Sequence, residues 1–434
     1  TVLSLSWGSA LSRGKADPED AQYKAKRSRD GKEASMAKDF QNLVPSASNM
    51  ARWQDMSTID TLPEFCPGSE SDEDDRLHSD SDHGNETTDT HMDLVDPEDV
   101  TAQVNKAISR GSHALDMSKR RFEIVRSLAE APSNYGLIML VRDLENGGGF
   151  AVAKTLPNIW VMSTPEEFKL ANPRARELPW QANGVSHFLA EKNFPYMCEP
   201  VGTFRDEVST YFISSFAAGG DLVNFLGCLS LPGPRREQRV RQVMAQAFSA
   251  VRHLHNLGLA HRDLSLENFV LTSTHNPQVK LIDFGMVSLT RRCKGELRGK
   301  PPYVAPEMHL GGEYDAFRAD AFSLGVLLYA LALGVLPWSS TTLRGSMSFC
   351  YASKRGLKRL MRQRWTTCAD GSKKSLVDAC SPSLLRLIQG LLAMRPSDRT
   401  TLGEVCFTKA TPRLPSAWEE DWLQDTTSSS REQV

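Results

Sequence analysis

Three oxygen-bearing side chains in two short segments could carry out chemistry together. Asp263 and Asn268 stand five positions apart in the segment 261–268, and Asp283 follows in the segment 282–285. A carboxylate can orient a hydroxyl group and accept its proton, and Asp and Asn oxygens are ligands that Mg²⁺ prefers. Phosphoryl transfer needs these groups, because it depends on positioning and charge stabilisation more than on covalent catalysis. The spacing therefore points to a phosphoryl-transfer site formed by two loops.

The sequence around these residues resembles the eukaryotic protein kinase superfamily, as a divergent serine/threonine member. His-Arg-Asp-Leu-Ser-Leu-Glu-Asn at 261–268 is similar to its catalytic loop, and Asp-Phe-Gly at 283–285 is similar to its metal-binding loop. The resemblance implies that Asp263 is the catalytic base and that Asn268 and Asp283 hold Mg²⁺. It covers about two-thirds of the chain. It implies a bilobal α+β kinase fold, with a small β-rich lobe and a larger helical lobe.

Further motifs of the superfamily follow in the same order along the chain. Ala305-Pro-Glu307 resembles the motif that closes the activation segment. Asp320 resembles the buried Asp that holds the catalytic loop, with Phe322 where the superfamily usually has Trp. Arg399 resembles the Arg that pairs with Glu307. Because breaking an ion pair inside the large lobe would leave a buried, unpaired charge, we expect this pair to be structural.

The resemblance also indicates how the chain would bind ATP. Lys154, after the apolar stretch 150–153, resembles the strand lysine that holds the α- and β-phosphates. The segment 211–222 resembles the connection between the lobes, where Ser214 gates the pocket behind adenine and, being small, predicts an open pocket. ATP and Mg²⁺ are therefore the implied cofactors. The implied nucleotide contacts are Gly136, Ile138, Val152, Lys154, Ser215, Ala217, Asp221, Asn268 and Asp283.

The phosphate-binding loop departs from the pattern of the superfamily. The stretch 128–136 keeps only its last glycine, Gly136, and places Ala131 and Ser133 where the first two glycines would stand. Glycine lets backbone N–H groups approach a phosphate closely, and each added Cβ obstructs that approach. We therefore expect weaker nucleotide binding, but not its loss.

The glutamate that should pair with Lys154 is also missing from its usual position. Counting back from the turn at 193–195 leads to Val185, or in another register to Ala182, and neither can pair with a lysine. Glu177 and Glu191 are the candidates to substitute from other registers.

At two further positions, a lysine and a hydroxyl residue have exchanged places relative to the pattern of the superfamily. Ser265 stands where serine/threonine kinases usually have the catalytic-loop lysine, and Lys300 stands where they usually have a threonine. We expect Lys300 to supply the missing positive charge at the γ-phosphate.

The activation segment, 283–307, contains Ser288 and Thr290 close to several basic residues. One hypothesis is that a phosphate on either hydroxyl pairs with these cations, or with Arg262, and orders the segment. The alternative is a basic surface that attracts acidic substrates. The nearby cations are Arg291, Arg292, Lys294 and Arg298.

These residues need a scaffold of strands followed by helices. Residues 122–141 and 150–153 carry apolar runs separated by the glycine-rich stretch 145–149, which predicts a hairpin followed by a strand. Apolar residues recur at helical spacing over 240–254, and 321–333 is apolar nearly all round, which predicts an amphipathic and a buried helix. Strands first and helices later suit two unequal lobes with a ligand cleft between them.

Composition constrains the partners and the location of the chain. The 434 residues carry a formal net charge of −2, which gives no reason to expect nucleic acid or an anionic membrane as the main partner. Eight cysteines occur singly, without a CxxC pair, which favours reduced thiols and an intracellular, cytoplasmic location. The best apolar stretch, near 324–336, is shorter than the ~20 residues that cross a bilayer.

The two ends of the chain differ from its centre. The first part contains an acidic, serine-containing run at 69–82 and too few apolar residues to offset the entropy of ordering. It reads as a solvated tail or, alternatively, as an acidic docking or phospho-acceptor segment. The last part, after residue 412, is also predicted to be flexible, unless Trp418 and Trp422 dock on the kinase-like domain. We expect three regions: a disordered extension over 1–118, a kinase-like domain over 121–412 and a flexible tail over 413–434.

These motifs predict an ATP-dependent serine/threonine kinase that transfers the γ-phosphate to protein hydroxyls. The poor phosphate loop and the missing helix glutamate favour the alternative, a pseudokinase that acts as a nucleotide-binding scaffold or allosteric partner. An enzyme acting on small molecules is disfavoured by Ala305-Pro-Glu307, which in the superfamily shapes a peptide-binding platform. The sequence leaves the protein substrate, the activator, the regulatory partner and the oligomeric state open.

Overall fold

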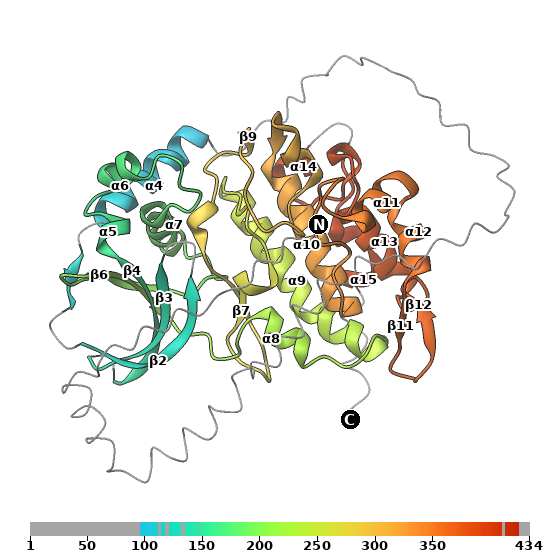
Figure 1. The fold of residues 1–434 in the computed structure, drawn as a ribbon, viewed down its shortest axis with the longest axis horizontal. Helices are drawn as coiled ribbons and strands as arrows, with labels where there is room; N and C mark the ends of the chain where they lie inside the picture. Colours follow the sequence, from blue (N-terminus) through green and yellow to red (C-terminus); the bar gives the residue numbers. More distant parts are fainter. Residues whose placement is uncertain are drawn as a thin grey trace, which may run out of the picture. The chain divides into compact units, whose positions relative to one another are not determined.

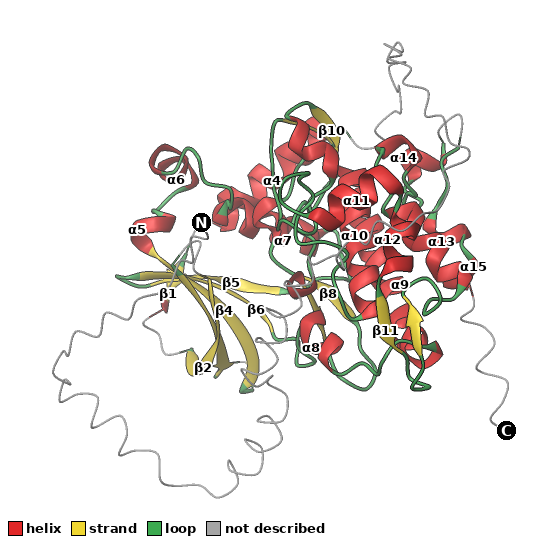
Figure 2. Ribbon diagram, turned by 45° about the vertical axis from the view of Figure 1, so that its right-hand side comes forward, coloured by secondary structure: helices red, strands yellow, loops and turns green. Residues whose placement is uncertain are grey.

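The computed structural model describes residues 96–111, 114–117, 121–131, 135–145, 147–409 and 413–424. Most of the expected N-terminal extension, including the acidic run, therefore lies outside the described residues. The described elements form a small lobe built on a sheet and a larger lobe built of helices (Figure 1 and Figure 2). The bilobal α+β fold expected from the sequence is confirmed.

The small lobe contains a six-stranded sheet with the strand order β1-β5-β6-β4-β3-β2. Neighbouring strands are antiparallel, except that β1 runs parallel to β5. Buried and less buried side chains largely alternate along β4, as a strand with one face on a core requires. The strands are β1 (Leu115–Asp116), β2 (Phe122–Ala131), β3 (Gly136–Asp143), β4 (Gly149–Pro157), β5 (Pro200–Arg205) and β6 (Ser209–Ser215). The predicted hairpin and following strand are β2, β3 and β4.

Within the residues that the structure describes, four helices accompany this sheet in the small lobe, and α7 is the one that packs against η4 of the large lobe. Helix α7 is the helix in which the sequence pattern places the glutamate partner of Lys154. It begins with a proline, whose fixed φ suits the first position of a helix. Its buried residues include Trp180, Val185 and Phe188. The helices of this part are α4 (Pro97–Gly111), α5 (Asn158–Val161), α6 (Pro165–Ala171) and α7 (Pro179–Glu191).

Helix α4 corrects the expected boundary of the disordered extension, which was placed at residue 118. Val100, Val104 and Ala107 are buried, and α4 packs along α7. A side-chain hydrogen bond from Asn183 to the carbonyl oxygen of Gly111 (3.2 Å) ties the end of α4 to α7. The apolar stripe of α4 has an i, i+4, i+7 spacing, so the helix is stabilised by tertiary packing even though the surrounding sequence is polar.

The large lobe is built around α9 and α10, the two helices predicted from their apolar patterns. Every residue of α10 is buried, so it forms the centre of the lobe. It is also long and apolar enough to span a membrane by length and composition alone, which is a common property of a buried core helix. The α-helices here are α8 (Leu222–Gly227), α9 (Pro234–Asn256), α10 (Ala316–Leu333), α11 (Met347–Arg355), α12 (Leu357–Gln363), α13 (Pro382–Leu391), α14 (Val405–Thr408) and α15 (Asp421–Gln424).

Short strands and 3-10 turns connect these helices. The strand pairs are β7 (Phe269–Leu271) with β8 (Val279–Leu281), β9 (Arg292–Lys294) with β10 (Glu313–Asp315), and β11 (Trp365–Thr367) with β12 (Lys373–Ser375). The 3-10 turns are η3 (Leu266–Asn268), η4 (Phe284–Met286), η5 (Pro306–Leu310), η6 (Pro396–Asp398) and η7 (Ala417–Glu419).

The first part of the C-terminal tail is also more ordered than expected. The indole of Trp422 is fully buried and its Nε1 donates to Glu237 on α9 (3.3 Å). Trp418 donates to the carbonyl oxygen of Leu402 (2.9 Å) and stacks under the Arg252 guanidinium. Both tryptophans thus dock on the large lobe, and residues 413–424 belong to the folded unit.

The ion pair between Arg399 and Glu307 forms inside the large lobe, as the sequence predicted. Two parallel bonds of 2.6 and 2.9 Å join the guanidinium to the carboxylate. Arg399 also donates to the carbonyl oxygen of Arg318 and lies over the ring of Phe322. This fully buried guanidinium therefore ties the end of the activation segment to α10 and to the turn before α14.

Candidate active site

Asp320 on α10 fixes the backbone of the loop that contains Asp263. Its two carboxylate oxygens accept hydrogen bonds from the backbone N–H groups of His261 (2.7 Å) and Arg262 (2.8 Å). Arg262 has a positive φ of 62°, a conformation that costs free energy in a residue with a side chain. The buried carboxylate holds this strained turn in place, which is the role that the sequence predicted for Asp320.

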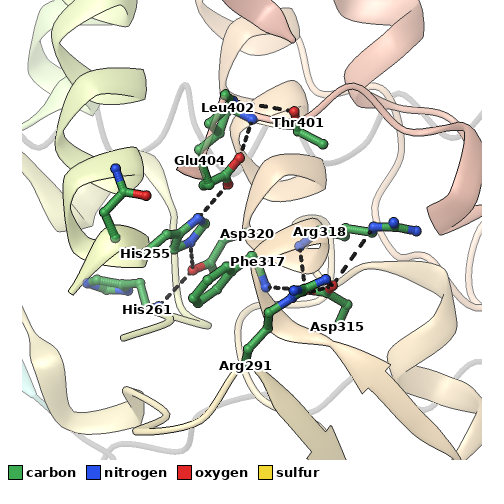
Figure 3. A network of polar contacts seen from close by, with 12 residues as sticks. His255, His261, Arg291, Asp315, Phe317, Arg318, Asp320, Thr401, Leu402 and Glu404 are labelled. Atoms are coloured by element: carbon green, nitrogen blue, oxygen red, sulfur yellow. Dashed lines mark hydrogen bonds and ion pairs between the residues drawn. The ribbon is translucent and has the colours of Figure 1, made fainter. Parts of the chain in front are cut away.

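A buried histidine, His255, links Asp320 to a second buried carboxylate, Glu404 (Figure 3). His255 on α9 lies between Asp320 (3.0 Å) and Glu404 (2.7 Å) and stacks on the ring of Phe317. Burial alone would lower the pKa of His255, but its bonds to the two carboxylates outweigh burial and raise the pKa to about 9. The imidazole is therefore charged at neutral pH, and it neutralises part of the buried negative charge that positions the loop.

Asp263 and Asn268 contact one another at the centre of the site. The Asn268 side-chain N–H donates to the backbone oxygen of Asp263 (2.7 Å) and to its carboxylate (3.1 Å). Burial raises the pKa of Asp263 to about 7, and Asp283 adds to the rise, whereas Lys300 and the Asn268 bond oppose it. A carboxyl with a pKa near neutrality is suited to accept a proton from a hydroxyl group.

Lys154 on β4 reaches from the small lobe to the second acidic residue. Its Nζ lies 2.6 Å from Glu177 and 3.4 Å from both carboxylate oxygens of Asp283. Burial would lower the pKa of Lys154, but the two carboxylates outweigh burial and raise it. For Asp283, burial would raise the pKa, but Lys154 and the Gly285 N–H lower it. The structure thus keeps a charged lysine against a charged carboxylate.

The partner of Lys154 is Glu177, one of the two substitutes that the sequence left open. Glu177 lies in the segment just before α7, where the N–H of Leu178 donates to the carbonyl oxygen of Gly285 (3.0 Å). A Cβ on Gly285 would lie only 2.7 Å from Cγ of Glu177, so this approach depends on glycine. Glu191, the other candidate, instead pairs with Arg110 of α4 (2.7 Å). Neither Val185 nor Ala182 is the position of the partner, because the glutamate that pairs with Lys154 lies in the segment before α7.

Replacing Glu177 with alanine should lower the kcat/KM for phosphoryl transfer by about 10- to 100-fold, because Lys154 loses its closest carboxylate. Glu191→Ala is the matched control and should change kcat/KM by less than about twofold, because its ion pair is exposed. Steady-state kinetics on both variants measure the difference. Equal losses for the two variants would contradict the assignment of Glu177.

Lys300 lies beside Ser265, as the exchanged residue types suggested. Its Nζ donates to the Ser265 hydroxyl (3.0 Å) and pairs with Glu267 (3.1 Å). Gly299, with a φ of 95°, lets the activation segment pass close to the catalytic loop, since a Cβ there would lie 2.9 Å from the Arg262 carbonyl oxygen. The structure therefore brings a cation from one segment to the position that a catalytic-loop lysine would otherwise fill.

The activation segment is held by a carboxylate that the sequence analysis did not single out. Glu296 pairs with Arg262 (2.7 Å) and lies 3.6 Å from Arg298. Burial would raise the pKa of Glu296, but its bonds to these guanidinium groups lower it. Two of the cations that were expected to receive a phosphate, Arg262 and Arg298, thus share one carboxylate.

The two hydroxyl groups proposed as phosphate acceptors differ in access. Ser288 is buried, and its hydroxyl lies 3.2 Å from Sγ of Cys293. Thr290 is exposed, and Arg291 nearby is buried in an ion pair with Asp315 (2.6 Å). The arrangement does not favour phosphorylation at Ser288, and it leaves Arg292 and Lys294 as the exposed cations of β9.

The remaining residues implied in nucleotide binding lie along the sheet and the connection after β6. Gly136 begins β3, Ile138 pairs across the strands with Lys154, and Val152 pairs with Ser214. The Ser215 hydroxyl accepts a bond from the Glu199 N–H (2.9 Å). Asp221 caps the start of α8 through the Asn224 N–H (2.8 Å), and Ala217 lies between β6 and α8. Ser133 of the degraded phosphate loop lies outside the described residues.

Ser214 on β6 is the cross-strand partner of Val152 on β4, and its substitution tests the predicted adenine pocket. Ser214→Met should raise the inhibition constant of a bulky ATP-competitive inhibitor by about tenfold or more, because the longer side chain fills the space behind adenine. The KM for ATP should change much less. Inhibition measured at several ATP concentrations checks this, and an unchanged inhibition constant would show that Ser214 does not gate the pocket.

Asn268 and Asp283 fit the requirements of a Mg²⁺ site. Asn268 uses its amide nitrogen on Asp263, which leaves its oxygen, the atom type that Mg²⁺ prefers, for a metal. Among the described residues there is no cluster of three or more His, Cys, Asp or Glu side chains that could hold a metal alone. Mg²⁺ commonly takes one or two protein ligands and completes its shell with phosphates and water, so this donor set suits a metal that arrives with a nucleotide.

Comparison with known proteins finds a match to the family model described as "Protein kinase domain" over residues 182–409. A serine/threonine-protein kinase SIK3 homolog from Danio rerio is 31% identical over 219 residues, which covers 50% of this chain and 16% of the relative. CBL-interacting protein kinase 22 from Oryza sativa subsp. japonica is 28% identical over 323 residues, covering 71% and 63%. A cGMP-dependent protein kinase from Eimeria tenella is 36% identical over 152 residues, covering 35% and 15%. The matches therefore span less than two thirds of each relative.

Proposed function

This chain belongs to the protein kinase family, and on that premise we propose that it transfers the γ-phosphate of ATP to serine or threonine hydroxyls of proteins. Relatives named as serine/threonine-protein kinases support the choice of hydroxyl group. An intracellular location is a further proposal, supported by the eight cysteines, which occur singly along the sequence without a CxxC pair.

One observation carries this proposal: groups from four separate segments converge with the charges that phosphoryl transfer needs. Lys154 is held charged by Glu177 and Asp283, and Asp263 is held with a pKa of about 7 beside Asn268. A buried carboxyl group whose pKa is raised close to 7, beside a second acidic residue, is typical of catalytic sites.

Each group has a definite task in this reaction. Lys154 would bind the α- and β-phosphates, and Mg²⁺ held by Asn268 and Asp283 would neutralise charge on the phosphates. Asp263 would orient the substrate hydroxyl and accept its proton as the oxygen attacks the γ-phosphorus, while the bond from this phosphorus to the bridging oxygen breaks and ADP leaves. Lys300, beside Ser265, would stabilise the charge that develops on the transferred group.

The pseudokinase alternative loses one of its two supports. It rested on the poor phosphate loop and on the absence of a partner for Lys154, and Glu177 supplies that partner at 2.6 Å. What remains is the loss of two glycines from the phosphate loop, which predicts a higher KM for ATP and not the absence of transfer.

The test is Mg²⁺-dependent transfer of labelled γ-phosphate from ATP to a generic basic protein by the full chain, with nucleotide binding measured in parallel. Transfer that stops when a chelator removes Mg²⁺ is the expected result. If the chain binds ATP but transfers nothing to any protein, the kinase proposal is overturned and the pseudokinase function replaces it.

A further inference from the structure

Helices α11 and α12 lie at the end of the large lobe that is away from the six-stranded sheet (Figure 1). Both helices carry exposed cations. Helix α12 buries Leu357, Leu360 and Met361 against the lobe. Its other face presents Lys358, Arg359 and Arg362 to solvent, at i, i+1 and i+4 spacing. We call the exposed cations of these two helices the basic face, which consists of Lys354, Arg355, Lys358, Arg359 and Arg362.

The basic face is not neutralised by neighbouring carboxylates. In the described part of the chain, none of its five cations forms an ion pair. Residues 344–374 contain nine Lys and Arg but only one acidic residue, Asp370, which pairs with Lys374. Like charges this close repel one another, so a chain with a net charge of −2 concentrates positive potential here at a cost to its own stability. That cost is offset if an anionic partner binds.

Exposed apolar side chains lie beside these cations in the chain. Trp365, which follows α12, is 67% exposed, and Met347, which begins α11, is 59% exposed. Large aromatic and Met side chains at the edge of a charged patch are typical of contact surfaces. Charge and apolar area together therefore indicate a docking surface.

We propose that the basic face binds the acidic run of this same chain, residues 70–82. That run has seven acidic residues and one arginine among thirteen positions, so its charge is opposite to that of the basic face. Covalent attachment gives such a segment a high effective concentration at a site on its own chain. No other segment of the sequence combines this density of acidic residues with serines, at positions 71, 79 and 81.

This interaction goes beyond the transfer reaction and does not depend on it, because binding needs neither ATP nor Asp263. The contacts are electrostatic and partly exposed, so salt should weaken them. A phosphate on a serine of the run would add nearly two negative charges and should strengthen binding.

A fluorescent peptide of residues 67–84 is titrated with the full chain, in which the seven acidic residues of the run are changed to Asn or Gln to remove competition. The peptide should bind at low salt and lose most of its affinity in about 0.5 M salt, where charges are screened within a few ångströms. The triple change Lys358→Glu, Arg359→Glu and Arg362→Glu should weaken binding at least about tenfold, because three attractive charges become repulsive.

The matched control is the triple change Lys106→Glu, Lys169→Glu and Lys409→Glu, which alters net charge equally at exposed positions on other elements. It should leave the affinity within about twofold if binding is local to the basic face. Thermal unfolding of both triple variants shows whether each is folded. Binding that falls equally in both, or a peptide with the acids neutralised that binds as well, would overturn the proposal.

The competing possibility is that the basic face binds an anionic membrane, which is tested by adding vesicles with and without phosphatidylserine to the native chain. If the peptide does not bind and anionic vesicles do, with the same dependence on the α12 cations, then the basic face contacts a membrane and the proposal is wrong. Hydrogen exchange of α11 and α12 gives a second readout in the native chain. Exchange in these two helices should be slower in the native chain than in the chain whose seven acidic residues at 70–82 are changed to Asn or Gln.

Discussion

Replacing Asp263 with asparagine is expected to lower kcat for phosphoryl transfer by about 10³-fold, within the range found for the loss of a general base. Asparagine keeps the size of the side chain and the contact with Asn268, but it cannot accept a proton. The KM for ATP should change little, because Asp263 is not assigned to the nucleotide. Single-turnover measurements with a serine-containing protein check kcat directly.

The stability of this variant separates a chemical effect from unfolding. Burial raises the pKa of Asp263 to about 7, so the folded chain binds a proton there more tightly than the unfolded chain does. The stability gained from this proton is fully present below the unfolded pKa of about 4 and is lost as pH rises through about 7. The neutral Asp263→Asn variant should therefore be at least as stable as the native chain at pH 8. A variant that loses both activity and stability would contradict this explanation.

The same pKa predicts the acidic limb of the activity. A base must be deprotonated to act, so kcat/KM of the native chain should fall as pH drops below about 7, by tenfold for each further pH unit. Lys300 opposes the raised pKa, so Lys300→Met should move this limb to higher pH. Rate profiles between pH 5.5 and 8.5 check both statements. A limb near pH 4 would mean that Asp263 is not the titrating base.

The second large effect concerns the exchange of Ser265 and Lys300. Lys300→Met should lower kcat by about 10²-fold to 10³-fold, as expected when a donor to the developing charge is removed. The double change Ser265→Lys with Lys300→Ser returns a lysine to the catalytic loop and should recover most of the loss, since the two side chains lie 3.0 Å apart. Recovery would show that the position of the charge matters, and not the segment that supplies it.

Lys294→Met is the control for this series, because Lys294 is exposed on β9 in the same activation segment. It should leave kcat within about twofold. If Lys300 served only to tie Ser265 to Glu267, Lys300→Met would lower stability, and the double change would not restore kcat. Measuring unfolding and kcat on all three variants distinguishes these outcomes.

The order of the motifs was enough to predict the two lobes and the loops that meet between them. Helical spacing of apolar residues identified α9, and a stretch that is apolar nearly all round identified α10. The pairing of Arg399 with Glu307 followed from their motifs. The capping role of Asp221 was missed, although Asp directly before a helix is a common cap and its position carried that signal.

The remaining features depend on contacts between segments that sequence spacing does not encode. Glu177 was one of two candidates, and the choice rests on the close approach of its segment to Gly285. Glu296 and His255 were missed because a lone Glu in a basic loop and a lone His on a helix resemble ordinary surface and core residues. Helix α4 was missed because its three buried residues lie in a polar stretch, although their spacing carried the signal.

The position of α4 matters for how this protein can be divided. The sequence motifs begin near residue 121, and a recombinant fragment would naturally be cut there. Such a fragment would lose Val100, Val104 and Ala107 and would leave the face of α7 against which α4 packs exposed to water. Exposed apolar area of this kind promotes aggregation and lowers solubility. A fragment for expression should therefore begin before Asp96, and one that begins at residue 121 would be expected to give poor yields and a misleadingly weak enzyme.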